Sequence, residues 1–373
     1  MNPETVFCAN LSCVAKGQAG KGNISVHSHQ EKRYKCEECG QSFTTSKGTL
    51  FYQLKTEPAK VILVLTLLVN GCPMQAIVAA FGYDQRTVRG WLKRAGQHCQ
   101  QVHQYLVSQN GLDLEQVQAD EIKAKVQGGN VWMAMAMAVK SRLWLGGVIS
   151  PHRDKGLIDA LAGQIRAWAL CRPLLLAVDG LRSYVGAFQR QFRAKVPREG
   201  QLGRSKLRAW DDVAIVQVVK KRTAGLLHIE RRIVQGSPEM VDRLIVASQG
   251  CGSINTAFIE RLNATFRQRL APLVRRSRAL ARQPQTLQYG MFFLGCVYNL
   301  CTYHSSLSIP FLLADNRRRL LKRTPAIAAG LTDHRWSIQE LFEFQIPPPL
   351  WSPPKRRGRH SKETIQLIER WCT

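Results

Sequence analysis

Three acidic residues, Asp120, Asp179 and Glu260, are of the type and in the setting that metal-dependent chemistry requires. Asp179 directly follows the apolar run LLLAV and precedes a glycine. It should therefore project from the carboxyl end of a strand, where open α/β sheets build their sites. Glu260 falls in a predicted helix, INTAFIERLNATFRQRL, and Asn263 and Arg267 share its face. Together these side chains offer oxygen ligands for a divalent cation and a fixed positive charge.

Each carboxylate also has a simpler interpretation. Asp179 could cap the helix that follows it, and Glu260 could be a solvated residue in an arginine-rich segment. Glu260 is, however, the only acidic residue in the block INTAFIERLNATFRQRLAPLVRRSRALAR, which favours a metal ligand at a phosphate-binding site. Glu121 follows Asp120 directly, and adjacent strand residues point to opposite faces. Only one of the two can therefore enter the site, and we choose Asp120.

Four cysteines near the N-terminus form two close pairs separated by a polar loop. They are Cys8, Cys13, Cys36 and Cys39. This pattern predicts a tetrahedral four-thiolate site for one structural Zn²⁺ ion. Zinc would supply folding free energy that this core-poor segment lacks, on the order of 10 kcal/mol. His27 and His29 could replace a cysteine ligand, and a segment without metal is a further alternative.

Apolar periodicity after Pro58 predicts three helices in a helix-turn-helix arrangement. They span Ala59–Val69, Met74–Phe81 and Gln85–Ala95. Gly82 can end the second helix by adopting a positive φ, and Asp84 can cap the third. The outer face of the third helix carries side chains suited to bases and phosphates in a major groove. These are Gln85, Arg86, Arg89 and Lys93. The alternative is an ordinary helical hairpin with a solvated basic face.

Strand-like and helical runs alternate in the region from about Glu115 to Ser306. The predicted strands are Val117–Lys123, Val131–Val139, Leu143–Ile149, Leu174–Val178 and Val213–Val219. A predicted helix over Lys155–Ala169 separates the third strand from the fourth. Three strands, a helix and a further strand indicate an α/β domain.

The charge of the chain indicates its partner. Lys and Arg total 53 against 26 Asp and Glu, a net charge of +27. Such a chain repels itself unless a polyanion neutralises it, and nucleic acid is the usual one. A ribosomal or membrane-surface protein is the alternative. The start, MNPETVFCAN, lacks a basic segment followed by an apolar run, so we expect no signal peptide, a cytoplasmic, nucleoid-associated location and reduced thiols.

The stretches LLAVDGLRSY and INTAFIERLNATFRQRLAPLVRRSRALAR are similar to segments of DDE transposases of bacterial insertion sequences, nearest to the insertion-sequence-one group. RTPAIAAGLTDHRWS also resembles the tail of related transposases. The resemblance runs through most of the chain, including the cysteine pairs and the helix-turn-helix. It implies an RNase H-like fold, a catalytic triad of Asp120, Asp179 and Glu260, and supporting roles for Asn263 and Arg267.

The expected cofactors are two Mg²⁺ (or Mn²⁺) ions, which activate the attacking oxygen and stabilise the leaving one in phosphodiester chemistry. By this hypothesis Asp120 bridges the ions, while Asp179 and Glu260 each complete one shell. Water would free a 3′-hydroxyl at the element end, which would then attack target DNA. The expected partners are double-stranded DNA (terminal inverted repeats and target) and further copies of the chain, as a homodimer or higher oligomer on DNA, with no membrane.

The predicted fold class is therefore a multidomain α/β chain with an N-terminal zinc ribbon, a helix-turn-helix and an RNase H-like mixed-sheet catalytic domain. We place the domains at residues 1–52, 55–108 and 114–308, followed by a Pro/Arg-rich tail at 309–373. Two other functions remain open. One is an RNase H-like nuclease or resolving enzyme without strand transfer, and the other is a catalytically inactive zinc-ribbon DNA-binding regulator.

Overall fold

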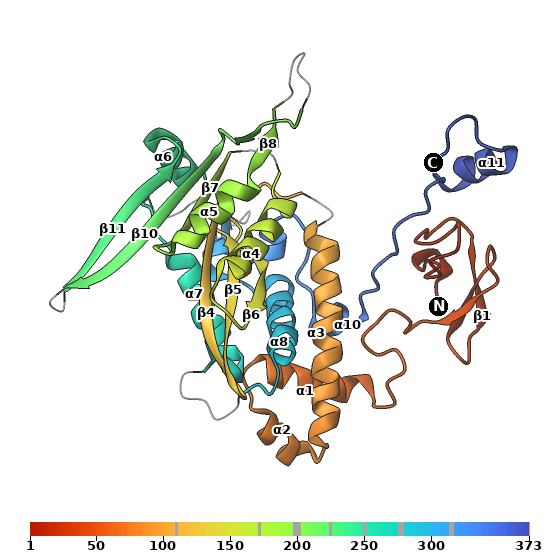
Figure 1. The fold of residues 1–373 in the computed structure, drawn as a ribbon. Coiled ribbons are helices and arrows are strands. Elements are labelled where there is room, and N and C mark those ends of the chain that lie inside the picture. Colours follow the sequence, from red (N-terminus) through yellow and green to blue (C-terminus); the bar gives the residue numbers. More distant parts are fainter. Residues whose placement is uncertain are drawn as a thin grey trace. The chain divides into compact units, whose positions relative to one another are not determined.

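The protein, in the computed structural model, is described over residues 1–108, 111–170, 173–196, 203–223, 226–248, 252–274, 280–312 and 317–372. The fold is mixed α/β and divides into two compact units (Figure 1). The smaller unit combines Met1–Pro58 with Phe342–Thr373, and the larger is Ala59–Leu341. Residues 309–341 of the expected tail thus belong to the larger unit, and the rest joins the cysteine-bearing segment.

The smaller unit is built on a three-stranded antiparallel sheet in the order β1-β2-β3. Its elements are η1 (Pro3–Thr5), β1 (Ile24–Ser28), β2 (Arg33–Cys36), β3 (Ser42–Thr44) and α11 (Lys362–Trp371). Trp371 of the amphipathic helix α11 is buried in one core cluster with Tyr34 and the cysteines. In addition, the Gln18 side chain donates to the Trp371 carbonyl at 2.9 Å. Helix α11 therefore adds to the core that the first 58 residues form.

Three helices begin the larger unit. They are α1 (Pro58–Val69), α2 (Met74–Phe81) and α3 (Gln85–Ser108). Gly82 ends α2 at a φ of 68°, as its position predicts. Helix α3 continues past the predicted end at Ala95 because its second half packs on α8 (Pro284–Cys296). A Cβ at Gly96 would lie 2.4 Å from the Cα of Tyr289, so this close packing requires glycine.

The core of the larger unit is a six-stranded mixed sheet in the order β11-β10-β7-β4-β5-β6. Its strands are β4 (Gln116–Val126), β5 (Gly129–Ala138), β6 (Trp144–Ser150), β7 (Leu174–Asp179), β10 (Val213–Thr223) and β11 (Leu226–Gln235). The first three are antiparallel, β7 and β10 run parallel to β4, and β11 is antiparallel at the edge. All five predicted strands are present. Strand β11 was not predicted, because it is exposed almost throughout and shows no clean alternation.

Helices cover both faces of this sheet (Figure 1). Helices α4 (Lys155–Trp168) and α5 (Arg182–Gln191) pack on the face that includes Val117, Ala119 and Val178. Helix α6 (Pro238–Ala247) packs on the other face, against Ala177 and Val216. Helix α7 (Ala257–Arg269) contacts β4 and β5. Alternate residues of each strand therefore face different helical layers.

The remaining elements are short connections. They are β8 (Arg193–Lys195), β9 (Leu207–Ala209), η2 (Ala271–Leu273), η3 (Val297–Cys301), η4 (Ser305–Leu307), β12 (Ile309–Leu312), β13 (Arg318–Leu321), α9 (Pro325–Ala328) and α10 (Ile338–Glu343). Among the described residues, no helix is both long and apolar enough to span a membrane.

Candidate metal centres

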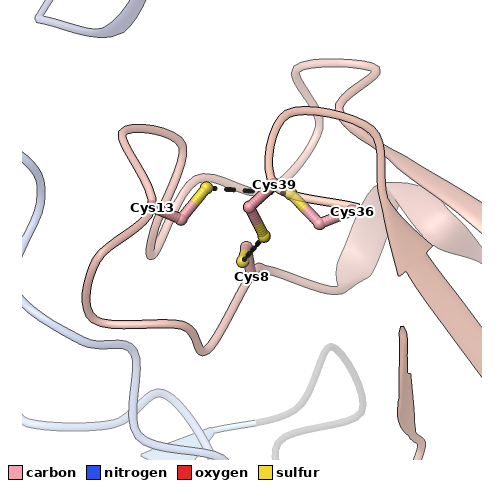
Figure 2. Close-up of side chains that lie close together, drawn as sticks. All are labelled: Cys8, Cys13, Cys36 and Cys39. Atoms are coloured by element: carbon pink, nitrogen blue, oxygen red, sulfur yellow. Dashed lines mark hydrogen bonds between the residues drawn. The ribbon is translucent and has the colours of Figure 1, made fainter. Parts of the chain in front are cut away.

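The four predicted cysteines converge on one point (Figure 2). One sulfur atom from each lies within 4.8 Å of the others. The Sγ atoms of Cys8 and Cys39 are 3.7 Å apart, and those of Cys13 and Cys36 are 3.9 Å apart. A tetrahedral zinc site with Zn–S bonds of about 2.3 Å places its sulfurs about 3.8 Å apart. The spacing therefore fits a zinc ion.

Tight turns hold the cysteines in this arrangement. The N–H of Gly40 donates to the carbonyl of Cys36 at 2.8 Å, and Gly40 has a φ of 68°. At the other pair, the N–H of Cys13 donates to the carbonyl of Asn10 at 3.0 Å. Neither His27 nor His29 belongs to the group. The candidate ligands that the fold brings together are therefore the four cysteines, without a histidine.

Ionisation of the thiols depends on their surroundings. Burial raises the pKa of the Cys8 thiol far above its usual range and that of Cys13 to about 11. Burial also raises the pKa of the Cys39 thiol, but hydrogen bonds from the Asn10 side chain and the Gln41 backbone outweigh it and lower the pKa to about 7. Since the thiolate is the metal ligand, a cation at the centre must stabilise the charges of the buried sulfurs.

The second group consists of carboxylates at one end of the central sheet. Asp120 lies on β4 and Asp179 ends the adjacent parallel strand β7, where Ala119 pairs with Val178. The two aspartates therefore occupy neighbouring positions on one face of the sheet. One oxygen each from Asp120, Asp179 and Glu121 lie within 4.8 Å of one another. Burial, followed by the charge of Glu121, raises the pKa of Asp120 to about 6.

Gln118 fixes the start of α7 on the same face of β4. This glutamine is fully buried, and its Oε1 accepts the N–H groups of Phe258 and Ile259, each at 3.0 Å. Its Nε2 donates to the carbonyl of Asn255 at 2.8 Å. N–H groups in the first turn of a helix lack partners within the helix. A buried strand glutamine therefore positions the helix that carries Glu260.

Asn263 links α7 to the carboxylate group. Its Nδ2 donates to Oδ2 of Asp120 at 2.8 Å. The Oδ1 of Asn263 is buried and has no hydrogen-bond partner within the described part of the chain. An orphaned buried oxygen beside clustered carboxylates is suited to a hard cation such as Mg²⁺, so the donor set fits the expected metal.

Glu260 is not part of the carboxylate group. The Nζ of Lys220 on β10 donates to its Oε1, and the hydroxyl of Thr256 donates to the same oxygen at 2.7 Å. Desolvation raises the pKa of Glu260, but these two partners outweigh it and bring the pKa below its usual value. The charge of Glu260 also contributes to the raised pKa of Asp120, so the two groups lie in the same neighbourhood. Lys220 therefore binds Glu260, the third predicted ligand, next to the carboxylate group.

Glu121 turns to the opposite face of β4. The Tyr184 hydroxyl of α5 donates to its Oε2 at 2.8 Å, and Nε of Arg153 donates to its Oε1 at 2.5 Å. Arg153 also lies 3.5 Å from Oδ2 of Asp179. This arrangement favours Asp120 over Glu121 as the ligand that faces α7. Neither Arg153 nor Tyr184 was predicted from the sequence, because an isolated arginine or tyrosine forms no motif.

The remaining predicted site residues lie on α7 and α3. The half-buried guanidinium of Arg267 forms no ion pair with the described residues, and the arginines at 275, 276 and 278 lie outside them. On α3, Arg86 and Lys93 are exposed. Gln85 and Arg89 are half-buried and line a cleft of about 760 Å³, together with apolar residues of α8. Oδ1 of Asp84 accepts the N–H of Arg86 at 2.7 Å, as expected of a cap.

No protein-family model matches this chain, and a search of curated proteins returns no match. The functional conclusion therefore depends on the geometry and on the sequence motifs.

Proposed function

We propose that the chain is a metal-dependent DNA transposase, which binds the ends of an insertion sequence, cleaves DNA strands and joins the 3′-hydroxyl ends to target DNA. The observation that carries the proposal is the pairing of Asp120 and Asp179 on adjacent parallel strands. They share one face of the sheet with Asn263, which donates to Asp120 at 2.8 Å. Glu260 lies on the same helix as Asn263.

The arrangement of the sheet supports an RNase H-like catalytic domain. Its first three strands are antiparallel, and β7 and β10 then run parallel to the first. The cysteine group supports a zinc ribbon, and the helices α1 to α3 support a helix-turn-helix. A net charge of +27 supports DNA as the partner.

In this proposal the residues have distinct tasks. Asp120 and Asp179 would hold divalent metal, and Glu260, which contacts Lys220 in this structure, would be the third ligand. Bound metal ions supply activation of the attacking oxygen and stabilisation of the leaving oxygen. Asn263 orients Asp120. Arg267, which has no acidic partner among the described residues, is available to bind a phosphate of the DNA backbone.

The test is incubation of the full chain and Mg²⁺ with duplex DNA that carries the inverted repeats flanking its gene. We expect strand nicking at the repeats followed by joining to a second duplex. Asp179→Asn should abolish both steps and leave DNA binding intact. Lys140→Gln, at the opposite end of the sheet, serves as the control and should behave as wild type.

Other outcomes of this assay identify the alternatives. Nicking without joining indicates a nuclease or resolving enzyme. Binding without cleavage indicates a DNA-binding regulator. Absence of duplex binding by the wild-type chain contradicts the proposal.

A further inference from the structure

Strands β10 and β11 form a ribbon that extends past the rest of the central sheet (Figure 1). Pairing of β10 with β7 ends at Val218, opposite Asp179. From Val219 to Thr223, β10 pairs only with β11 among the described strands. Burial ends at the same point, since Lys220 and the three residues after it are exposed. The ribbon beyond Val218 is therefore a two-stranded arm with solvent on both faces.

Cations dominate the arm. It carries Lys220, Lys221 and Arg222 against the single acid Glu230, and Arg231 and Arg232 follow on β11 where the arm joins the sheet. Glu230 lies 2.5 Å from Arg232 and 3.9 Å from Lys221. Arg222 pairs with no acid in the described part of the chain, so its charge is available to a partner. This balance fits a polyanion better than a second protein surface.

Large apolar side chains of β11 lie exposed at the free end of the arm. Leu226 is 68% exposed, Leu227 is 52% exposed and Ile229 is 44% exposed. Because Arg222 pairs with Leu227 and Lys220 with Ile229, these two cations lie beside apolar side chains on one face, whereas Lys221 and Leu226 lie on the other. A row of leucine and isoleucine side chains exposed to water is unfavourable and indicates a binding surface. An isolated two-stranded ribbon is also only marginally stable without a partner.

The arm is also aligned with the carboxylate site. Val216 packs with α6, on the face shared by Asp120 and Asp179, and alternation places Lys220 and Arg222 on that same face. The contact of Lys220 with Glu260 of α7 agrees with this placement. A duplex that reaches the carboxylates from this end of the sheet meets the arm.

We infer that this arm binds duplex DNA next to the cleavage site by lying in its major groove. That groove is about 12 Å wide and admits a two-stranded β-ribbon. The face that carries Arg222, Leu227 and Ile229 turns to the bases, so that Leu227 and Ile229 pack on base edges such as thymine methyl groups. The long side chains of Lys221 and Arg222 reach phosphates. The inference rests on the proposed function, because it takes duplex DNA as the substrate. It assigns DNA binding outside the metal site to this arm.

The experiment measures the affinity of the full chain for a duplex over a salt series. Lys221→Gln combined with Arg222→Gln should weaken binding and reduce the slope of log K against log salt by about 0.9 for each phosphate that the variant no longer neutralises. Leu227→Ser combined with Ile229→Ser should weaken binding by about fivefold at every salt concentration, without a change in slope. Lys140→Gln and Leu170→Ser are matched controls from the other end of the sheet and should bind as wild type.

The outcomes separate this inference from the proposed function. If wild type binds and cleaves DNA and both arm variants match it, the arm inference is overturned and the proposed function stands. If wild type binds no duplex, the proposed function fails as well. Sedimentation without DNA tests for a protein partner, because a change in oligomeric state in the Leu227 and Ile229 variant alone overturns the inference. All four side chains are exposed, so unchanged thermal unfolding is expected, and Arg222→Lys should retain the wild-type slope.

Discussion

The cysteine group and the carboxylate group differ in how complete they are. All four cysteine sulfurs lie within 4.8 Å of one another, at the spacing a zinc ion requires. The carboxylate group brings Asp120 and Asp179 together but leaves Glu260 bound to Lys220. The fold alone brings all four cysteine sulfurs together, whereas Glu260 would have to leave Lys220 to join Asp120 and Asp179 as the proposed third ligand.

The reason lies in where the ligands come from. The cysteines are carried by two tight turns whose backbone hydrogen bonds fix each pair locally. The carboxylates come from β4, β7 and α7, so their distances depend on strand register and on the packing of a helix over the sheet. Glu260 also has a long, exposed side chain that reaches the nearest cation.

The largest expected effect follows removal of one thiolate from the cysteine group. Cys36→Ser should abolish zinc binding and unfold the smaller unit, because structural zinc contributes on the order of 10 kcal/mol to folding. Metal analysis of the purified chain and near-ultraviolet circular dichroism measure the two effects. Cys372→Ser, an exposed cysteine of the same unit, is the control and should retain one zinc. Unchanged zinc in the Cys36 variant contradicts the assignment.

A change at Gln118 should disturb the carboxylate site without touching a carboxylate. Gln118→Leu leaves the N–H groups of Phe258 and Ile259 buried without partners, at a cost of about 2–4 kcal/mol in the free energy of unfolding. Urea unfolding measures this loss, and zinc content should stay unchanged. Gln235→Ala removes a single hydrogen bond, to Val213, and should cost about 1 kcal/mol. Equal losses in the two variants argue against a positioning role for Gln118.

Removal of the contact between Lys220 and Glu260 gives the smallest expected effect. Their side chains are 43% and 45% exposed, so the ion pair contributes at most about 1 kcal/mol. Lys220→Gln should therefore strengthen Mn²⁺ binding by no more than about fivefold, as the competing cation is gone. Lys221→Gln, which points to the other face of the strand, should leave it unchanged. Weaker Mn²⁺ binding in the Lys220 variant means that the lysine supports the site.

The sequence predicted the parts of these sites that depend on local pattern. The cysteine pairs, the cap at Asp84, the stop at Gly82 and the strand that ends at Asp179 all follow from residue type and spacing. The contacts of Glu260 with Lys220 and of Glu121 with Arg153 and Tyr184 could not be predicted. They join residues brought together only by sheet register and helix packing. The buried Gln118 had a faint signal, as a polar residue in an apolar strand two positions before Asp120.

Binding of Mn²⁺ tests most directly whether Asp120 and Asp179 hold divalent metal on the α7 face of the sheet. Titration followed by electron paramagnetic resonance should show two Mn²⁺ ions bound to the wild-type chain, as a two-metal site requires. Asp120→Asn and Asp179→Asn should each lose this binding. Glu121→Gln should retain it, because Arg153 and Tyr184 already hold Glu121 on the opposite face. Unchanged Mn²⁺ binding in Asp120→Asn, with loss in Glu121→Gln, would contradict the account.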